Sequence, residues 1–257
     1  MKEKKKKTDH LLALIREGQP MTSGEQLRLT VALSVPAIVT QLSAIVMQYI
    51  DAAMVGSLGA NASASIGLVS TTTWLFWGLC AAASTGFSVQ VAHRIGAGDW
   101  DCARSILRRS VPSTFAFSAL LATIGVSVSG ALPQWLGGDS AIRSDASLYF
   151  LIFSLFLPIL QMNFLAAGML RCSGNMRIPS IAGVLMCILD VVFNFFLIFP
   201  SRELSVGGLT LSIPGAGLGV QGAALGTGLA ESVAAAITLW YLFTRSSGLK
   251  IKAWRKS

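Results

Sequence analysis

The chain has 257 residues, of which 53% are hydrophobic and 12% are charged, and its mean hydropathy is +0.64. Soluble proteins carry about 25% charged residues, so this composition excludes an ordinary soluble domain and indicates an integral membrane protein. The net charge of +8 does not indicate a nucleic-acid-binding protein, because the basic residues form short clusters between apolar runs without interleaved aromatic residues.

A membrane-spanning helix needs about 20 mostly apolar residues. Residues 1–29 form a basic leader that lacks the cleavage site of a signal peptide, and residues 244–257 form a basic tail or inter-lobe linker. Between them we predict an all-α integral membrane protein, a six-transmembrane-helix bundle over residues 30–243. The six predicted spans are 30–57, 63–92, 111–132, 147–170, 179–200 and 218–243.

The distribution of basic residues predicts the orientation of these spans. With the N-terminus in the cytoplasm, 18 of the 20 lysine and arginine residues fall in cytoplasmic segments, and only Arg143 and Arg202 lie outside. This asymmetry satisfies the positive-inside rule. We therefore expect a multi-pass protein of the cytoplasmic membrane with both termini in the cytoplasm.

Acidic residues inside the spans are rare, because only Asp51, Asp190 and Glu231 of the twelve acids fall there. A charged side chain at the bilayer centre costs at least about 2.5–3.5 kcal/mol, so each is a candidate functional residue. Asp190 lies ~15 Å from the inner end of its span, with Asn194 one turn further out. Thr227 and Glu231 lie ~13 Å and ~19 Å below the outer end of theirs. Since Asp51 is in the outer third of the first span, these side chains are expected to form one polar cluster.

Two short motifs suggest enzymes that their context excludes. GLGVQG at residues 217–222 matches the GxGxxG dinucleotide fingerprint, but it opens a membrane helix instead of following a strand. Close helix packing through Gly222 and Gly226 explains it better. GAGD at residues 96–99 resembles an intramembrane aspartyl protease motif, yet Asp51 is predicted near the opposite membrane face, too far away to share a proton. We expect a protein that is not an enzyme.

Four segments occur in an order that is typical of one transporter family. They are LSVPAIVTQLSAIVMQYIDAAMVGSLG in the first span, GFSVQVAHRIGAGDWDCAR after the second, AAGMLRCSGNMRIPSIAG after the fourth and GLGVQGAALGT where the sixth begins. This series resembles the multidrug and toxic compound extrusion (MATE) transporters. Members of that family have about twelve helices in two lobes around a central cavity, so the resemblance implies that this chain corresponds to the N-terminal six-helix lobe.

The resemblance also implies a coupling-cation site, to which Asp51, Asp190, Asn194 and Thr227 correspond. The residues at positions 190 and 194 are exchanged relative to the order in many members, but their i, i+4 spacing keeps both on one helix face. H⁺ and Na⁺ therefore both stay open as the coupling ion. No other cofactor or metal is expected.

By the same resemblance, the chain is expected to take part in H⁺- or Na⁺-coupled antiport that exports organic, cationic compounds. The expected partners are the lipid bilayer, the small organic substrate and a second six-helix lobe or a second copy, with no nucleic acid. Glu231 and Gln90 are additional candidate site residues, although hydrogen bonding between helices also explains them. Pro36 removes a backbone hydrogen bond and is either a helix bend that moves or a fixed kink.

Two alternatives stay open. A lipid-linked saccharide flippase of the same superfold needs several arginines in its cavity to bind a pyrophosphate, and no arginine is predicted in mid-span. A non-transporting membrane scaffold would tolerate the loss of the buried acids.

Overall fold

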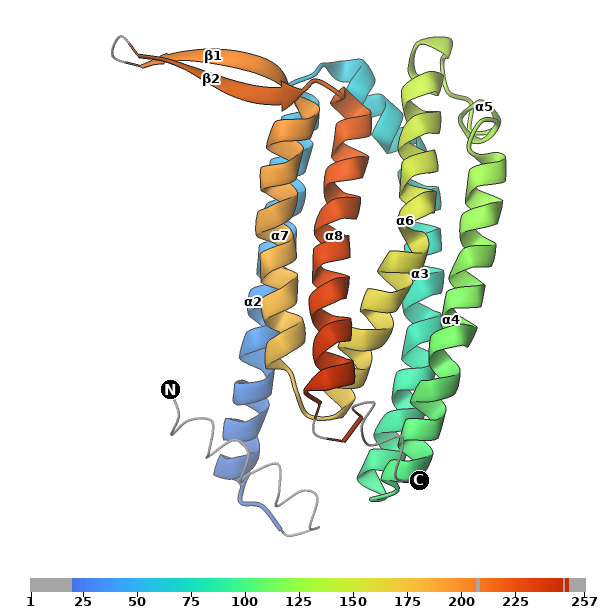
Figure 1. Cartoon of the computed structure of the whole chain (residues 1–257), viewed down its shortest axis with the longest axis vertical. Helices are drawn as coiled ribbons and strands as arrows, with labels where there is room; N and C mark the ends of the chain where they lie inside the picture. The colour runs from blue at the N-terminus through green and yellow to red at the C-terminus, as the bar shows by residue number, and fades with distance from the viewer. Residues whose placement is uncertain (1–19, 207–208, 247, 250–257) are drawn as a thin grey trace.

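The computed structural model describes residues 20–206, 209–246 and 248–249. Residues 1–19 of the predicted leader and most of the predicted tail lie outside these residues. The described part contains six long helices that form one bundle (Figure 1). They are α2 (Ser23–Gly56), α3 (Ala60–Gly96), α4 (Trp100–Val128), α6 (Ser140–Cys172), α7 (Arg177–Ile198) and α8 (Gly219–Thr244).

All six helices are long and apolar enough to cross a membrane, so the six predicted spans are confirmed. The main difference lies at the start of α4, which begins at Trp100, whereas the predicted span begins at residue 111. The first turns of α4 carry Asp101 and Arg104 and are capped by the Asp99 side chain, which accepts a hydrogen bond from the backbone of Cys102. A criterion based on hydropathy misses such turns because they are helical but charged.

Shorter elements connect the long helices at one end of the bundle (Figure 1). The helical turn α5 (Leu132–Trp135) precedes α6. Strands β1 (Pro200–Val206) and β2 (Leu209–Ala216) pair antiparallel between α7 and α8. Neither strand is among the predicted elements, because a search for apolar runs of about 20 residues does not detect short strands. The alternation of Leu209, Leu211 and Ile213 with polar residues, directly after two glycines, is the hairpin signal in this segment.

Helices α7 and α8 form a tightly packed pair, with α2 against α7 and α6 against α8. A Cβ atom at Gly222 would lie 2.6 Å from the backbone carbonyl of Leu197, so the α7 and α8 backbones touch. Only glycine permits this approach at that position. The structure thus confirms helix packing as the role of this glycine in the GLGVQG motif.

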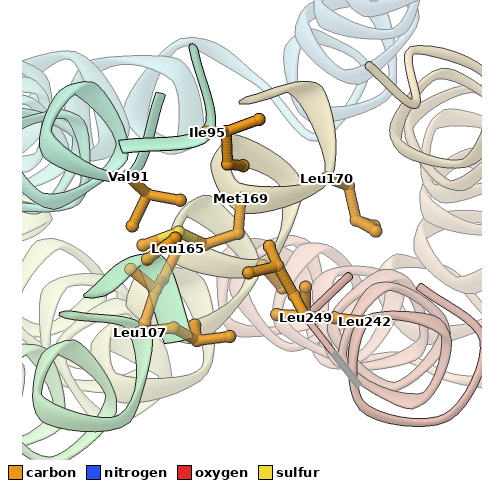
Figure 2. Packing of buried hydrophobic residues seen from close by; sticks show 10 residues of the cluster. Val91, Ile95, Leu107, Leu165, Met169, Leu170, Leu242 and Leu249 are labelled. Atoms are coloured by element: carbon orange, nitrogen blue, oxygen red, sulfur yellow. The ribbon is translucent and has the colours of Figure 1, made fainter. Parts of the chain in front are cut away.

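The chain continues past α8 and folds back onto the bundle, in a segment that we call the clasp (Ser246, Gly248 and Leu249). Leu249 is completely buried in a cluster with Leu107 of α4, Leu165 of α6 and Leu242 of α8 (Figure 2). The Gly248 carbonyl accepts a hydrogen bond of 2.9 Å from Nε of Arg104. A Cβ atom at Gly248 would overlap the Trp100 ring. The first residues of the predicted tail therefore belong to the bundle core.

Replacing Leu249 with alanine should lower the free energy of unfolding by about 2–5 kcal/mol, because it removes a buried leucine and leaves a cavity. Leu120 of α4 is 59% exposed and provides the matched control, whose replacement with alanine should have little effect. Denaturant unfolding in detergent measures both. A Leu249→Ala variant that is as stable as the unmodified chain would show that the clasp does not stabilise the bundle.

Candidate functional site

The side chain of Asn194 connects the two predicted site aspartates. Its Nδ2 donates a hydrogen bond of 2.9 Å to Oδ1 of Asp51 and one of 3.2 Å to Oδ2 of Asp190. Asp190 and Asn194 are completely buried on α7, one turn apart, and Asp51 is partly buried on α2. The structure therefore brings together three of the four predicted coupling residues from two helices, and we call them the acid cluster.

The acid cluster contains two buried oxygen atoms without a hydrogen-bond donor. Oδ1 of Asp190 and Oδ1 of Asn194 accept no hydrogen bond from the described residues. The Thr227 side chain lies close to the Asp190 carboxyl group, but its hydroxyl donates to the Ala223 carbonyl at 3.1 Å. A buried polar atom without a partner costs about 1–3 kcal/mol. A proton or a cation at the cluster would satisfy these acceptors.

The donor set fits a small hard cation as well as a proton. Carboxylate, amide and hydroxyl oxygens are the ligands that hard cations prefer, and the acid cluster with Thr227 offers oxygen of all three kinds. A protonated carboxyl group would instead donate one hydrogen bond to a neighbouring acceptor. The geometry therefore admits both H⁺ and Na⁺.

Helix α8 shapes the acid cluster through Gly226. A Cβ atom at this position would overlap Oδ1 of Asn194 and lie 3.0 Å from its Cγ. The missing side chain lets Asn194 lie against the α8 backbone, next to Thr227. The second predicted packing glycine thus also determines where the shared amide group lies.

An aromatic pocket of about 190 Å³ adjoins the acid cluster. Its walls include Trp77, Tyr149, Phe153, Phe156, Thr227 and Glu231. Thr227 therefore lies beside Asp190 and also lines the pocket. No arginine, lysine or histidine is found among its described lining residues.

The remaining predicted site residues lie outside the acid cluster. Glu231 is buried, and its Oε1 accepts a hydrogen bond of 2.6 Å from Nδ2 of Asn163. Gln90 is exposed on α3, where its amide donates to the Gly86 carbonyl at 3.3 Å. Helix α2 continues through Pro36, whose carbonyl accepts a 2.9 Å hydrogen bond from Thr40.

Two residues of this region are not among the predicted site residues. Tyr149 of α6 lines the aromatic pocket and lies near Asp51 and Asp190. Asn163 of the same helix binds Glu231. An asparagine inside an apolar span is a signal that could have drawn attention to α6, because such side chains usually hydrogen-bond to another helix.

Comparisons with known proteins give a match to one family model. The sequence model of the MatE family matches residues 36–196. The chain is similar to a "FAD transporter" of Shewanella oneidensis, with 22% identity over 188 residues that cover 72% of this chain and 42% of that protein. It is also similar to the "Probable multidrug resistance protein NorM" of Thermotoga maritima, with 26% identity over 219 residues that cover 84% and 44%. The chain thus spans somewhat less than half the length of these relatives.

A solved structure shares the fold. The outward-facing conformation of a multidrug resistance MATE family transporter of the MOP superfamily superposes with a TM-score of 0.76 at 23% identity. The match covers 90% of this chain and 49% of that one. The bundle therefore has the architecture of half of such a transporter.

Replacing Gly226 with alanine should destabilise the chain by about 1–3 kcal/mol, because the new methyl group displaces Asn194 or separates α7 from α8. Gly78 on α3 is the matched control, since a Cβ atom there meets no heavy atom within 4 Å. Replacing Gly78 with alanine should be neutral or slightly stabilising. Unfolding measurements in detergent that show no difference between the two variants would contradict the role given to Gly226.

Proposed function

Because the chain belongs to the MATE family, whose members are transporters and not enzymes, we propose that it supplies the ion-coupling lobe of a multidrug exporter. The proposed reaction is H⁺- or Na⁺-coupled antiport of organic cations across the cytoplasmic membrane. The observation that carries this proposal is the acid cluster, in which one amide group joins two aspartates and two buried oxygens lack donors.

The proposed coupling step is neutralisation of the acid cluster by an ion. Two ionised carboxylates at close range repel each other, and binding of H⁺ or Na⁺ relieves this repulsion. Helix α2 packs mainly against α7, and Asp51 is the residue through which α2 contacts the Asn194 amide. Ion binding would therefore favour one position of α2 over another. We place the bend at Pro36, whose nitrogen cannot donate to the preceding turn.

The proposed substrate carries a positive charge. Three acids, Asp51, Asp190 and Glu231, are buried or partly buried in or near the aromatic pocket. No basic side chain lines this pocket in the described part of the chain. This supports export of organic cations over transport of an anion such as FAD, the substrate in the name of one relative. It also opposes a pyrophosphate-linked flippase substrate, which needs arginines.

The proposed partner is a second six-helix lobe or a second copy. The polar side chains of Gln41 and Gln48 are exposed on α2, at depths where the helix is otherwise apolar. Unsatisfied polar groups in lipid cost several kcal/mol each. A partner lobe that covers this side of α2 would remove that cost.

We propose that both termini lie in the cytoplasm, because the basic residues gather at one end of the bundle. Most described arginines lie at helix ends on the side opposite the β1–β2 hairpin (Figure 1). They are Arg28, Arg94, Arg104, Arg108, Arg109, Arg171, Arg177 and Arg245.

Labelling of single cysteines tests this orientation. Ser105 of α4 and Ser144 of α6 are both exposed and lie near opposite ends of the bundle. In a background with all four native cysteines replaced by alanine, a membrane-impermeant maleimide should label Ser105→Cys only from the cytoplasmic side and Ser144→Cys only from outside. The reverse pattern would overturn the orientation.

Asp190→Asn should abolish gradient-driven export while leaving the fold intact, because it is nearly isosteric and removes the buried charge. The measurement is efflux from vesicles under an imposed pH or Na⁺ gradient, with thermal unfolding as the check on folding. Asp101→Asn is the control, because Asp101 pairs with Arg104 near the surface, where an ion pair contributes only about 0–1 kcal/mol. Coupled transport that persists in Asp190→Asn would exclude Asp190 from the coupling site.

A further inference from the structure

The aromatic pocket is too small for a whole drug molecule. Its volume of about 190 Å³ is below the ~300–1,000 Å³ of sites that enclose drug-sized ligands. One aromatic ring or one substituted ammonium group fits this space. The pocket is therefore suited to one end of a larger compound, or to a small aromatic amine.

Glu231 is the acidic residue among the described residues that line this pocket. Glu231 is only 9% exposed, and its Oε1 accepts a hydrogen bond from the Asn163 amide. The Thr238 hydroxyl lies 2.9 Å from the Asn163 oxygen and can donate to it or to the carbonyl of Ala234 or Ala235. No described residue donates a hydrogen bond to the other carboxylate oxygen, Oε2. The carboxylate is thus held in place with one oxygen still able to bind a ligand.

A glycine on α8 allows an aromatic ring to line the same pocket as Glu231. A Cβ atom at Gly228 would overlap the ring of Phe156, so the missing side chain lets that ring lie against α8. Glu231 follows three residues later on the same helix, and residues at this spacing share a face. Aromatic faces and a carboxylate together attract an organic cation more strongly than either group alone.

We propose that Glu231 recognises the positive charge of the transported compound and that the aromatic pocket receives its aromatic or ammonium end. This proposal rests on the export function proposed above, but it assigns Glu231 to the substrate and not to the coupling ion. Thr227 lies beside Asp190 and lines the same pocket as Glu231, so the two sites are close to each other. A cation in the pocket and an ion at the acid cluster therefore repel each other, as antiport requires.

Binding of two isosteric probes tests the proposal. Benzyltrimethylammonium and neopentylbenzene have nearly the same shape, and only the first is charged. Their affinities for the full chain in lipid nanodiscs are measured by tryptophan fluorescence, since Trp77 lines the pocket, and Trp77→Phe identifies the pocket signal. Glu231→Gln retains an oxygen for the Asn163 amide. It should weaken binding of the cation by at least about tenfold and change binding of the neutral probe by less than about twofold.

The other outcomes separate this role from a structural one. Glu231→Asp, which keeps the charge, should restore part of the cation affinity. Unchanged cation affinity in Glu231→Gln would overturn the proposal. An equal loss of affinity for both probes would also overturn it, because it indicates a collapsed pocket. If Glu231→Gln selectively weakens cation binding while Asp190→Asn retains coupled transport, charge recognition stands and the coupling assignment fails. The opposite pair of results keeps the coupling site and rejects Glu231.

Discussion

One amide group, the side chain of Asn194, links the parts of this bundle that bear on transport. It donates to a carboxylate on α2 and to a carboxylate on its own helix, α7. Because an amide group has two N–H donors, this side chain can hold both acids at once and leave its oxygen free of a donor. The same residue lies against the α8 backbone at Gly226. Three helices therefore depend on the position of one side chain.

The helices around this amide differ in how firmly they are held. Backbone contact at Gly222 makes α7 and α8 a close pair, and α6 packs along the other side of α8. Helix α2 packs mainly on α7, and several of its large apolar side chains, such as Leu42 and Tyr49, are exposed. Local opening costs less free energy in a region with few buried contacts than in the core. The arrangement favours a fixed α6–α7–α8 unit and an α2 helix that can move against it.

Hydropathy and residue depth predict much of this structure from the sequence. The six spans follow from apolar runs, and the meeting of Asp51 with Asp190 and Asn194 follows from their depths on different helices. Depth does not determine which way a helix face turns or which helices are neighbours. For this reason Gln90, on another face of α3, lies outside the cluster, and the Asn163 partner of Glu231 is not predicted. The burial of Leu249 is also unexpected, because a single leucine among polar residues forms no apolar run.

The clasp has a mechanical consequence for the acid cluster. Leu249 is buried among residues of α4, α6 and α8, and Arg104 of α4 binds the neighbouring carbonyl. A pulling force on the chain beyond residue 249 is therefore distributed over several helices and does not act on the end of α8 alone. Helix α8, which carries Thr227 and Gly226, is in this way shielded from axial load, and motion of a connected segment need not shift the register of the coupling residues.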